Sequence, residues 1–335
     1  MRYLFLLIFA FQSHAQISDF DTIDFTKADR IALECKNERL NNLPELSYKL
    51  TSKLTTDVER FRAIFTWVCG NIANDYVYYT KNMRKRQRYK NDSLKLQNWN
   101  SQFRKATLKK LIKNNKTICT GYAYLIKKLS DLANIDCEIV HGFARTSTVD
   151  VEKLDIPNHS WNAVKLNGKW YLCDPTWASG IPNPSTSIFE FQYNDGFFLS
   201  NPKLFAINHF PVDKKWLLLD DFDKTSFKAF IEAPIIYGKA YANLNNHFEP
   251  QKMHNTILKN EKVTFKFELL KPVVVKDVKL LIDSGYNSKK INPDSTTIKN
   301  QLLTVEYKFK YTGFYDVHFF IKGDLISTYT FKVKS

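Results

Sequence analysis

The sequence HSWNAVKLNGKWYLCD occupies residues 159–174 and predicts a β-hairpin. Two strand-like runs flank Asn167-Gly168, a dipeptide that strongly favours a two-residue turn between antiparallel strands. With this turn, residue 166 pairs with 169, and residue 161 pairs with 174. His159 and Asp174 then lie near the same end of one hairpin, close enough to share a hydrogen bond.

A cysteine upstream of this hairpin lies at the start of a helical pattern. Apolar residues recur at helical spacing from Cys119 to Ala133. The thiol is therefore expected in the first turn of a buried helix, where free backbone N–H groups favour an anion. Cysteine attacks as a thiolate, and a histidinium partner would also favour that form. Cys119, His159 and Asp174 thus suit the roles of nucleophile, base and orienting carboxylate.

Each of these residues also has an ordinary explanation when taken alone. Cys119 would be a buried inert thiol, His159 a core or surface histidine, and Asp174 the end of a strand. Gly121 either allows close approach of a substrate or only eases helix packing. The predicted hairpin favours the functional interpretation, because it brings two of the three residues together.

The resemblance to a known family rests on several motifs. They are Cys119-Thr120-Gly121-Tyr122-Ala123, His159-Ser160-Trp161-Asn162-Ala163-Val164, Trp170-Tyr171-Leu172-Cys173-Asp174-Pro175-Thr176-Trp177, and a downstream stretch that includes His209-Phe210-Pro211. With these motifs the chain resembles the transglutaminase-like superfamily, on the branch of kyphoscoliosis-type peptidases, over roughly residues 40–220. Lys116-Thr117-Ile118 departs from the Gly-Val or Gly-Ile pair that many members carry before the cysteine.

The resemblance implies an α+β fold with a papain-like transglutaminase core, and Cys119, His159 and Asp174 as its catalytic triad. It further implies acyl transfer on amide or peptide bonds of a protein or peptide substrate, with hydrolysis slightly favoured over glutamine cross-linking. The candidate substrate-binding residues are Gly121, Tyr122, Trp161 and Trp177. The Cys119 N–H is a natural oxyanion donor. The alternatives are a catalytically silent binding or scaffolding protein at the cell surface and, more weakly, an unrelated β-rich adhesin.

The N-terminus has the pattern of a secretory signal peptide over residues 1–15, which predicts a periplasmic or extracellular protein. The five cysteines of the remaining chain are an odd number, so at least one thiol is expected to be unpaired. Cys137 and Cys173 are expected near each other, either as two buried free thiols or as a disulfide. The histidines show no metal-ligand spacing, and neither a metal nor a cofactor is expected.

Positive charge is concentrated before the cysteine. Residues 81–116 hold thirteen Lys or Arg and one acid, Asp92, out of a net charge of +15 for the whole chain. This segment is either a solvated basic face or a binding surface for an anionic partner, such as an acidic protein, an anionic polymer or a membrane surface. Nucleic acid is not expected, because readout motifs are missing and the chain is predicted to be exported.

Organisation along the chain predicts two domains after the signal peptide. A transglutaminase-like domain is expected over residues 16–225, with its motif core at 57–220. Within it, residues 57–71 form an amphipathic helix, residues 76–105 a loop or irregular helix, and residues 178–196 a surface excursion beside the cleft. Residues 226–335 alternate in the manner of strands, which predicts an immunoglobulin-like β-sandwich domain.

Overall fold

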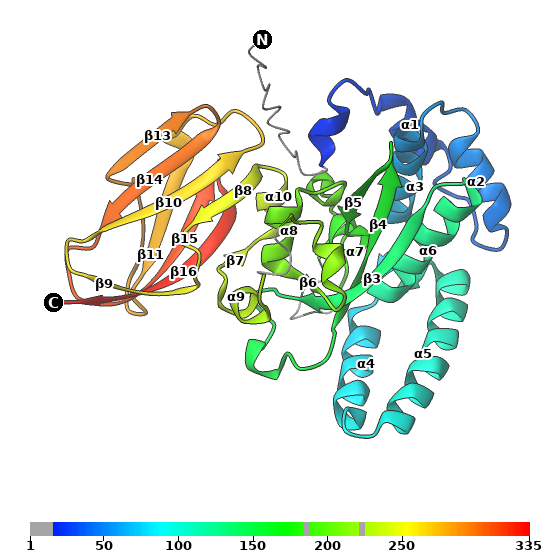
Figure 1. Cartoon of the computed structure of the whole chain (residues 1–335), viewed down its shortest axis with the longest axis horizontal. Coiled ribbons are helices and arrows are strands. Elements are labelled where there is room, and N and C mark those ends of the chain that lie inside the picture. The colour runs from blue at the N-terminus through cyan, green and yellow to red at the C-terminus, as the bar shows by residue number, and fades with distance from the viewer. Residues whose placement is uncertain (1–15, 182, 184–185, 187, 221–224) are drawn as a thin grey trace, which may run out of the picture.

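The computed structural model describes residues 16–181, 183, 186, 188–220 and 225–335. The predicted signal peptide, residues 1–15, lies outside these residues. The chain forms a mixed α/β half and a strand-rich half that lie side by side (Figure 1). Within the described residues, we find no helix with the length and apolar character that a membrane span needs.

The α/β half packs helices against an antiparallel sheet with the strand order β5-β4-β3-β6. These strands are β3 (Cys137–Ala144), β4 (His159–Leu166), β5 (Lys169–Cys173) and β6 (His209–Pro211). The main helices are α1 (Thr26–Glu34), α2 (Leu43–Thr51), α3 (Asp57–Asn71), α4 (Tyr76–Tyr89), α5 (Ser93–Asn114), α6 (Cys119–Leu132), α7 (Pro175–Ser179) and α8 (Pro202–Asn208). This arrangement confirms the α+β class expected for a transglutaminase-like core.

The predicted hairpin forms with the expected turn. Leu166 pairs with Lys169, and the ladder of β4 and β5 continues to Asn162 opposite Cys173. Asn167 and Gly168 both have positive φ, 48° and 81°, as a type I′ turn requires. Most of β4 is buried on both faces, because α6 covers one side of the sheet and α8 lies near the other. Trp161, Ala163, Val164 and Leu166 supply its apolar surface, and the buried polar side chains His159, Ser160 and Asn162 all have hydrogen-bond partners.

Residues 76–105 differ from the sequence-based expectation, which was a loop or an irregular helix. They form α4 and most of α5, two regular helices that project from the core as an antiparallel pair (Figure 1). The side chains of Asp75 and Asp92 cap the helix N-termini by accepting backbone N–H groups. Phe103 of α5 stacks on Tyr78 of α4 at 4.4 Å, and Trp99 of α5 donates from its Nε1 to the Asn82 Oδ1 of α4 at 3.0 Å. These contacts join two helices that carry many like charges.

The strand-rich half is a sandwich of two sheets, as predicted. One sheet has the order β13-β14-β10-β8, and the other has the order β12-β11-β15-β16-β7, with β9 parallel to β16. The strands are β7 (Ile235–Ile236), β8 (Leu244–Glu249), β9 (His254–Leu258), β10 (Lys262–Leu269), β11 (Val278–Asp283), β12 (Ser288–Ile291), β13 (Ser295–Lys299), β14 (Leu302–Lys308), β15 (Gly313–Ile321) and β16 (Asp324–Lys334). Phe267 of one sheet packs on Phe319 of the other at 4.6 Å.

A short connecting segment joins the two halves. It contains α9 (Phe227–Glu232), the two-residue strand β7 and α10 (Gly238–Tyr241). β7 pairs with β16 of the sandwich, whereas Tyr241 packs on Phe197 of the α/β half at 4.4 Å. One continuous hydrophobic core therefore runs through both halves. The immunoglobulin-like assignment and the boundary at residue 226 remain predictions.

Candidate active site

Cys119 is the first residue of α6, as the helical pattern predicted. Just before it, Lys116 and Thr117 pair in parallel with Ala73 and Asn74, which fixes the chain that enters the helix. The N-cap residue, Ile118, supplies no side-chain acceptor to the first turn. The thiol thus lies where backbone N–H groups favour negative charge.

The β4–β5 hairpin brings His159 and Asp174 together. His159 begins β4, Asp174 follows β5, and the His159 Nε2 lies 2.7 Å from the Asp174 Oδ2. Because Nε2 is occupied by the carboxylate, Nδ1 is the imidazole nitrogen left for a reacting group. Asn162 of β4 donates to the Ala123 carbonyl of α6 at 3.0 Å, which fixes the hairpin relative to the helix that begins with Cys119.

The Asp174 carboxylate accepts hydrogen bonds at both oxygens. Oδ1 accepts the backbone N–H groups of Thr176 at 2.9 Å and Trp177 at 3.1 Å, so Asp174 is also the N-cap of α7. Oδ2 contacts His159 and, at 3.1 Å, the Nε2 of His209. Asp174 is fully buried, and a buried carboxylate is stable as an anion only when donors surround it in this way.

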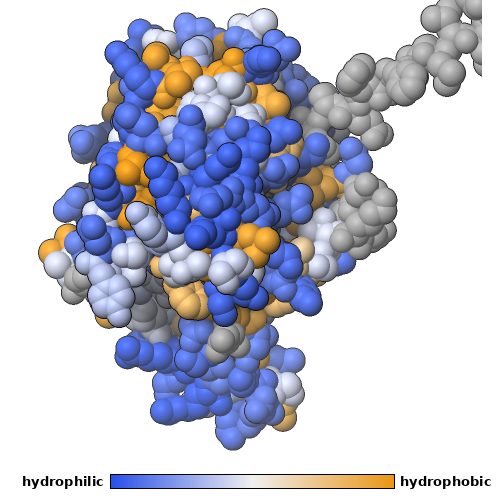
Figure 2. Space-filling view, turned by 90° about the vertical axis from the view of Figure 1, so that its left-hand side faces the viewer, coloured by the Kyte–Doolittle hydropathy of each residue, from blue (hydrophilic) through white to orange (hydrophobic). Residues whose placement is uncertain are grey.

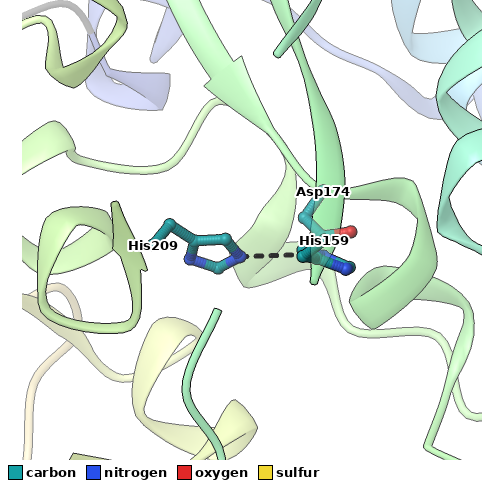
Figure 3. Close-up of side chains that lie close together, drawn as sticks. All are labelled: His159, Asp174 and His209. Atoms are coloured by element: carbon teal, nitrogen blue, oxygen red, sulfur yellow. Dashed lines mark hydrogen bonds and ion pairs between the residues drawn. The ribbon is translucent and has the colours of Figure 1, made fainter. Parts of the chain in front are cut away.

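His209 is the functional-site residue that sequence reasoning missed. The spacing of the histidines gives no sign of its role, and only the resemblance of His209-Phe210-Pro211 to the family's downstream stretch singles it out. It begins β6, which pairs with β3 and not with the β4–β5 hairpin. Figure 3 shows its ring directed at the pair of Asp174 and His159. Sequence spacing carries no signal for this contact, because it depends on a three-residue strand joining the far side of the sheet.

The pKa values of this cluster are shifted in opposite directions. Burial lowers the pKa of His159, but the charge and hydrogen bond of Asp174, with a further contribution from Cys119, outweigh burial and raise it. Burial raises the pKa of Asp174, but the charge of His159 and the hydrogen bonds from both histidines lower it well below its usual range. Burial lowers the pKa of His209 to about 4, against the opposing effect of Asp174. His159 and Asp174 thus form an ion pair beside a neutral His209.

His159, Asp174 and His209 also offer three ligand atoms within 4.8 Å of one another. Hydrogen bonding explains their closeness, since one carboxylate oxygen contacts both Nε2 atoms. The expectation that the protein uses no metal remains a prediction.

Cys119 and His159 line a cleft of about 850 Å³. Its walls come from α4, from the loop 146–156, from residues 180–181 and from the connecting segment 235–238. The residues at 180–181 belong to the excursion that was expected to border the cleft. The walls from α4 and from 235–238 were not expected, because each reaches the cleft only through tertiary packing.

The four candidate substrate-binding residues occupy different places. Trp177 lines the cleft and stacks beside the His159 ring at 5.3 Å. Tyr122 and Trp161 have no exposed surface, and Tyr122 donates to the Ile72 carbonyl in the core. Gly121 is buried, and a Cβ there would lie 1.9 Å from Thr117 Oγ1, which supports the packing interpretation of this glycine. A substrate in the cleft can therefore meet Trp177, whereas the other three belong to the core.

All five cysteines are free in the structure, including Cys137 and Cys173. Burial raises the pKa of each of the four outside the candidate site, and raises that of Cys137 to about 12. These four thiols are therefore poor nucleophiles at neutral pH.

Helix α4 contributes a cation near the thiol. Arg86 is half-buried, its Nη1 donates to the Pro157 carbonyl at 2.6 Å, and its Nε has no hydrogen-bond partner. Burial lowers the pKa of Arg86, whereas the negative charge of a Cys119 thiolate and of Tyr79 raises it. Among the side chains that the structure describes, no acid forms an ion pair with this guanidinium.

Comparison with known proteins gives one family match. Residues 44–175 match the model of the transglutaminase-like superfamily. Kyphoscoliosis peptidase of Homo sapiens is 34% identical over 204 residues, which are 59% of this chain and 27% of that protein. Hillarin of Drosophila melanogaster is 26% identical over 212 residues, 59% of this chain and 23% of that protein. The chain thus spans about a quarter of the length of these relatives.

Solved structures give weaker likenesses. A crystal structure of a TGase covers 45% of this chain and 32% of its own, at 16% identity and a TM-score of 0.27. The Lin-41 filamin domain covers 24% of this chain and 82% of its own, at 15% identity and a TM-score of 0.20.

Proposed function

We propose that this chain, whose residues 44–175 match the transglutaminase-like superfamily, is a cysteine-dependent acyl-transfer enzyme acting on amide or peptide bonds. Cys119 is the proposed nucleophile, His159 the acid and base, and Asp174 the carboxylate that orients the imidazole. The observation that carries the proposal is the buried pair of His159 and Asp174, whose histidine lines the same cleft as a thiol at a helix N-terminus.

The proposed reaction has two steps. The Cys119 thiolate attacks the carbonyl carbon, and the C–N bond breaks as the His159 imidazolium protonates the leaving amine or ammonia. The resulting thioester is then attacked by water or by an amine, whose proton passes to His159, and the thiolate leaves. The Cys119 N–H is the proposed first oxyanion donor. Asp174, which is held as an anion, stabilises the imidazolium in the steps in which His159 carries the extra proton.

We favour hydrolysis slightly over glutamine cross-linking, because the relatives at 34% identity are named as peptidases. The triad serves both outcomes equally, so the acceptor must be identified by experiment. Incubation of a protein substrate with a fluorescent primary amine separates them. Cleavage gives new termini that carry the atoms of water, whereas cross-linking gives covalent capture of the amine.

The substrate is proposed to be a protein or peptide with an acidic region. Of the thirteen cations in residues 81–116, Lys90, Lys95 and Lys110 form ion pairs with Asp155, Asp92 and Asp75 among the described side chains. Lys81, Arg84 and Arg88 on α4 are exposed, and Arg84 also lines the cleft. The lowest part of the molecule, where α4 and α5 lie in Figure 1, is mostly hydrophilic in Figure 2. An acidic segment is the partner that complements this wall.

The deciding experiment for catalysis uses a thiol-directed activity probe and mass spectrometry of the labelled residue. Cys119 should be labelled fastest at pH 6, and His159→Ala should slow its labelling strongly. Cys119→Ser should remove turnover of peptide substrates while the protein stays folded. Equal labelling of all five cysteines in the folded protein would instead favour a silent binding or scaffolding role.

We further propose that the protein acts after export, in the periplasm or at the cell surface. The proposal depends on the signal-like pattern of residues 1–15. Identification of the N-terminal residue of the protein from fractionated cells tests it, since cleavage after Ala15 should leave Gln16 first.

A further inference from the structure

His209 and Asp174 meet although they come from separate parts of the sheet. His209 lies opposite Ala144 in the pairing of β6 with β3, whereas Asp174 follows β5 at the other edge. Both side chains are buried, with 1% and 0% of their surfaces exposed. Their contact, 3.1 Å between Nε2 and Oδ2, is thus shielded from water and does not break by solvation.

The His209 ring is held in place by aromatic neighbours. It stacks on Phe205 with centroids 3.7 Å apart and planes within 11°. Trp177 lies at 4.4 Å and Trp161 at 5.1 Å, the latter edge-on. A ring confined on these sides presents its Nε2 in one direction only, toward the carboxylate shared with His159 (Figure 3).

The two neighbours of the ring nitrogens decide which nitrogen carries the proton. Nε2 lies near the Asp174 carboxylate, and Nδ1 lies 3.3 Å from the Phe205 carbonyl oxygen, so both neighbours are acceptors. A neutral imidazole has one N–H to donate, and the carboxylate is the stronger acceptor at the shorter distance. His209 is therefore the Nε2–H tautomer, and it gives Asp174 a hydrogen bond without a charge. His159 supplies the charge that balances Asp174.

We propose that His209 is a positioning residue for the proposed triad. Its Nε2–H fixes the Asp174 Oδ2 at the point where that oxygen meets the His159 Nε2. Oδ1 is already anchored by the N-terminus of α7, so the carboxylate is held at both oxygens and the imidazole of His159 is oriented with it. This inference rests on the proposed function, since it assigns the residue that supports the same site.

Removal of the His209 donor leaves Oδ2 with a single partner. Without that donor, Oδ2 is less firmly held opposite the His159 Nε2, so the hydrogen-bonded ion pair that stabilises the His159 imidazolium loses its geometry. The thiolate of Cys119, which the imidazolium favours, should become scarcer at acidic pH. We expect His209→Phe to slow alkylation of Cys119 at pH 6 by about ten- to a hundredfold, the range of a hydrogen bond to a charged group.

The experiment follows the rate of Cys119 alkylation by iodoacetamide against pH in four proteins. His209→Phe keeps the stacked ring without a donor, and its pH profile should move up by about one to two units. His209→Gln keeps an N–H donor and should restore most of the rate. His141→Phe is the matched control, since His141 lies on β3 of the same sheet and its Nδ1 contacts Ser160 and not Asp174. Melting curves accompany each variant.

If folded His209→Phe has the same pH profile of Cys119 alkylation as the wild type, the positioning role is overturned and the proposed function is unaffected. Folded Gln and Phe variants with equal losses also overturn it, because the donor then plays no part. Failure of the proposed function has another signature, namely a wild-type rate that His159→Ala does not change. If the His209 variants do not fold, imidazole nitrogen NMR of the wild type decides, since an Nδ1–H tautomer of His209 overturns the inference.

Discussion

Two hairpins border the cleft, and they differ in nearly every physical respect. The β4–β5 hairpin is largely buried and joined by a two-residue turn, and it carries His159 and leads into Asp174. The α4–α5 hairpin projects into solvent, is strongly basic, and carries cleft residues such as Tyr79 and Arg84. We infer that the buried hairpin fixes the chemistry, whereas the exposed one selects what reaches it.

The largest effect is expected at the buried hairpin. His159→Ala and Asp174→Asn should each reduce turnover by about a thousandfold or more, because members of a triad act as a unit. Peptide hydrolysis measures this loss, and iodoacetamide labelling at pH 6 should slow in parallel for His159→Ala. An equally large loss of turnover from replacing exposed cations of α4 would show that both hairpins take part in the chemistry.

The second effect concerns the packing that joins β3 to β6. A Cβ at Gly142 would lie 2.3 Å from the Phe210 carbonyl oxygen and 2.5 Å from the Trp161 ring. Gly142→Ala should therefore cost about 3 kcal/mol of unfolding free energy, since overpacking forces the neighbours to shift. It should also lower Cys119 reactivity, because β6 carries His209.

Denaturant unfolding measures that cost, and Gly70→Ala is the matched control. Nothing lies within 4 Å of a Cβ at Gly70, which is in α3, so that variant should be stabilised by about 1 kcal/mol through helix propensity. Equal stability of the two variants would contradict the tight contact at β6.

A fall in pH should destabilise the fold through the histidines His209 and His247, while the Lys and Arg residues of the exposed α4–α5 hairpin keep their charge. Burial lowers the pKa of His209 and of His247 to about 4, from an ordinary value of 6.5. A base with a lowered pKa contributes stability that is present above pH 6.5 and is lost as the pH falls toward 4. As the pH falls from 6.5 to 4, each of these histidines should reduce the free energy of unfolding by up to about 3 kcal/mol.

Melting temperature against pH measures this loss, and His247→Phe should remove part of it. His159 behaves oppositely. Its raised pKa contributes stability below pH 6.5 that is lost only as the pH rises through the higher folded value. A melting temperature that stays flat from pH 6.5 to 4 would mean that neither buried histidine is neutral.

A smaller effect is expected where the exposed hairpin touches the chemistry. Arg86→Gln should slow Cys119 alkylation at pH 6 by about three- to tenfold, because it removes a half-buried cation near the thiolate. Arg84→Gln is the control, since Arg84 is exposed. If Cys119 is alkylated at the same rate in both variants, Arg86 does not affect the thiolate, and the α4–α5 hairpin has no part in the chemistry.

The smallest effect is expected from the exposed cations. Replacement of Lys81, Arg84 and Arg88 by Gln should weaken binding of an acidic peptide by about threefold to tenfold at low salt, and the difference should fade near physiological ionic strength. Cys119 alkylation should not change. As a control, replacement of the exposed Lys276, Lys289 and Lys299 of the sandwich by Gln removes the same amount of charge. If both triple variants bind equally, the basic wall is only a solvated face.

The contrast between the hairpins also explains where sequence reasoning succeeded. The β4–β5 hairpin was predicted in its register, because Asn167-Gly168 fixes a turn through the backbone angles of two adjacent residues. The α4–α5 hairpin was expected to be irregular, because its charge dominated the pattern. Its helices are stabilised across the pair, where Phe103 stacks on Tyr78 and Lys110 pairs with Asp75. Contacts between residues so far apart in the sequence produce no local periodicity from which a helix can be predicted.

The sequence by itself determined the helix that begins at Cys119 and the proximity of His159 to Asp174. Both depend on interactions between neighbours along the chain, namely a helix start and a tight turn. Only the tertiary structure decided the second partner of Asp174, because His209 arrives from β6 after a long excursion and joins the opposite edge of the sheet. The cleft walls from α4 and from residues 235–238 were decided in the same way, since packing between distant segments sets them.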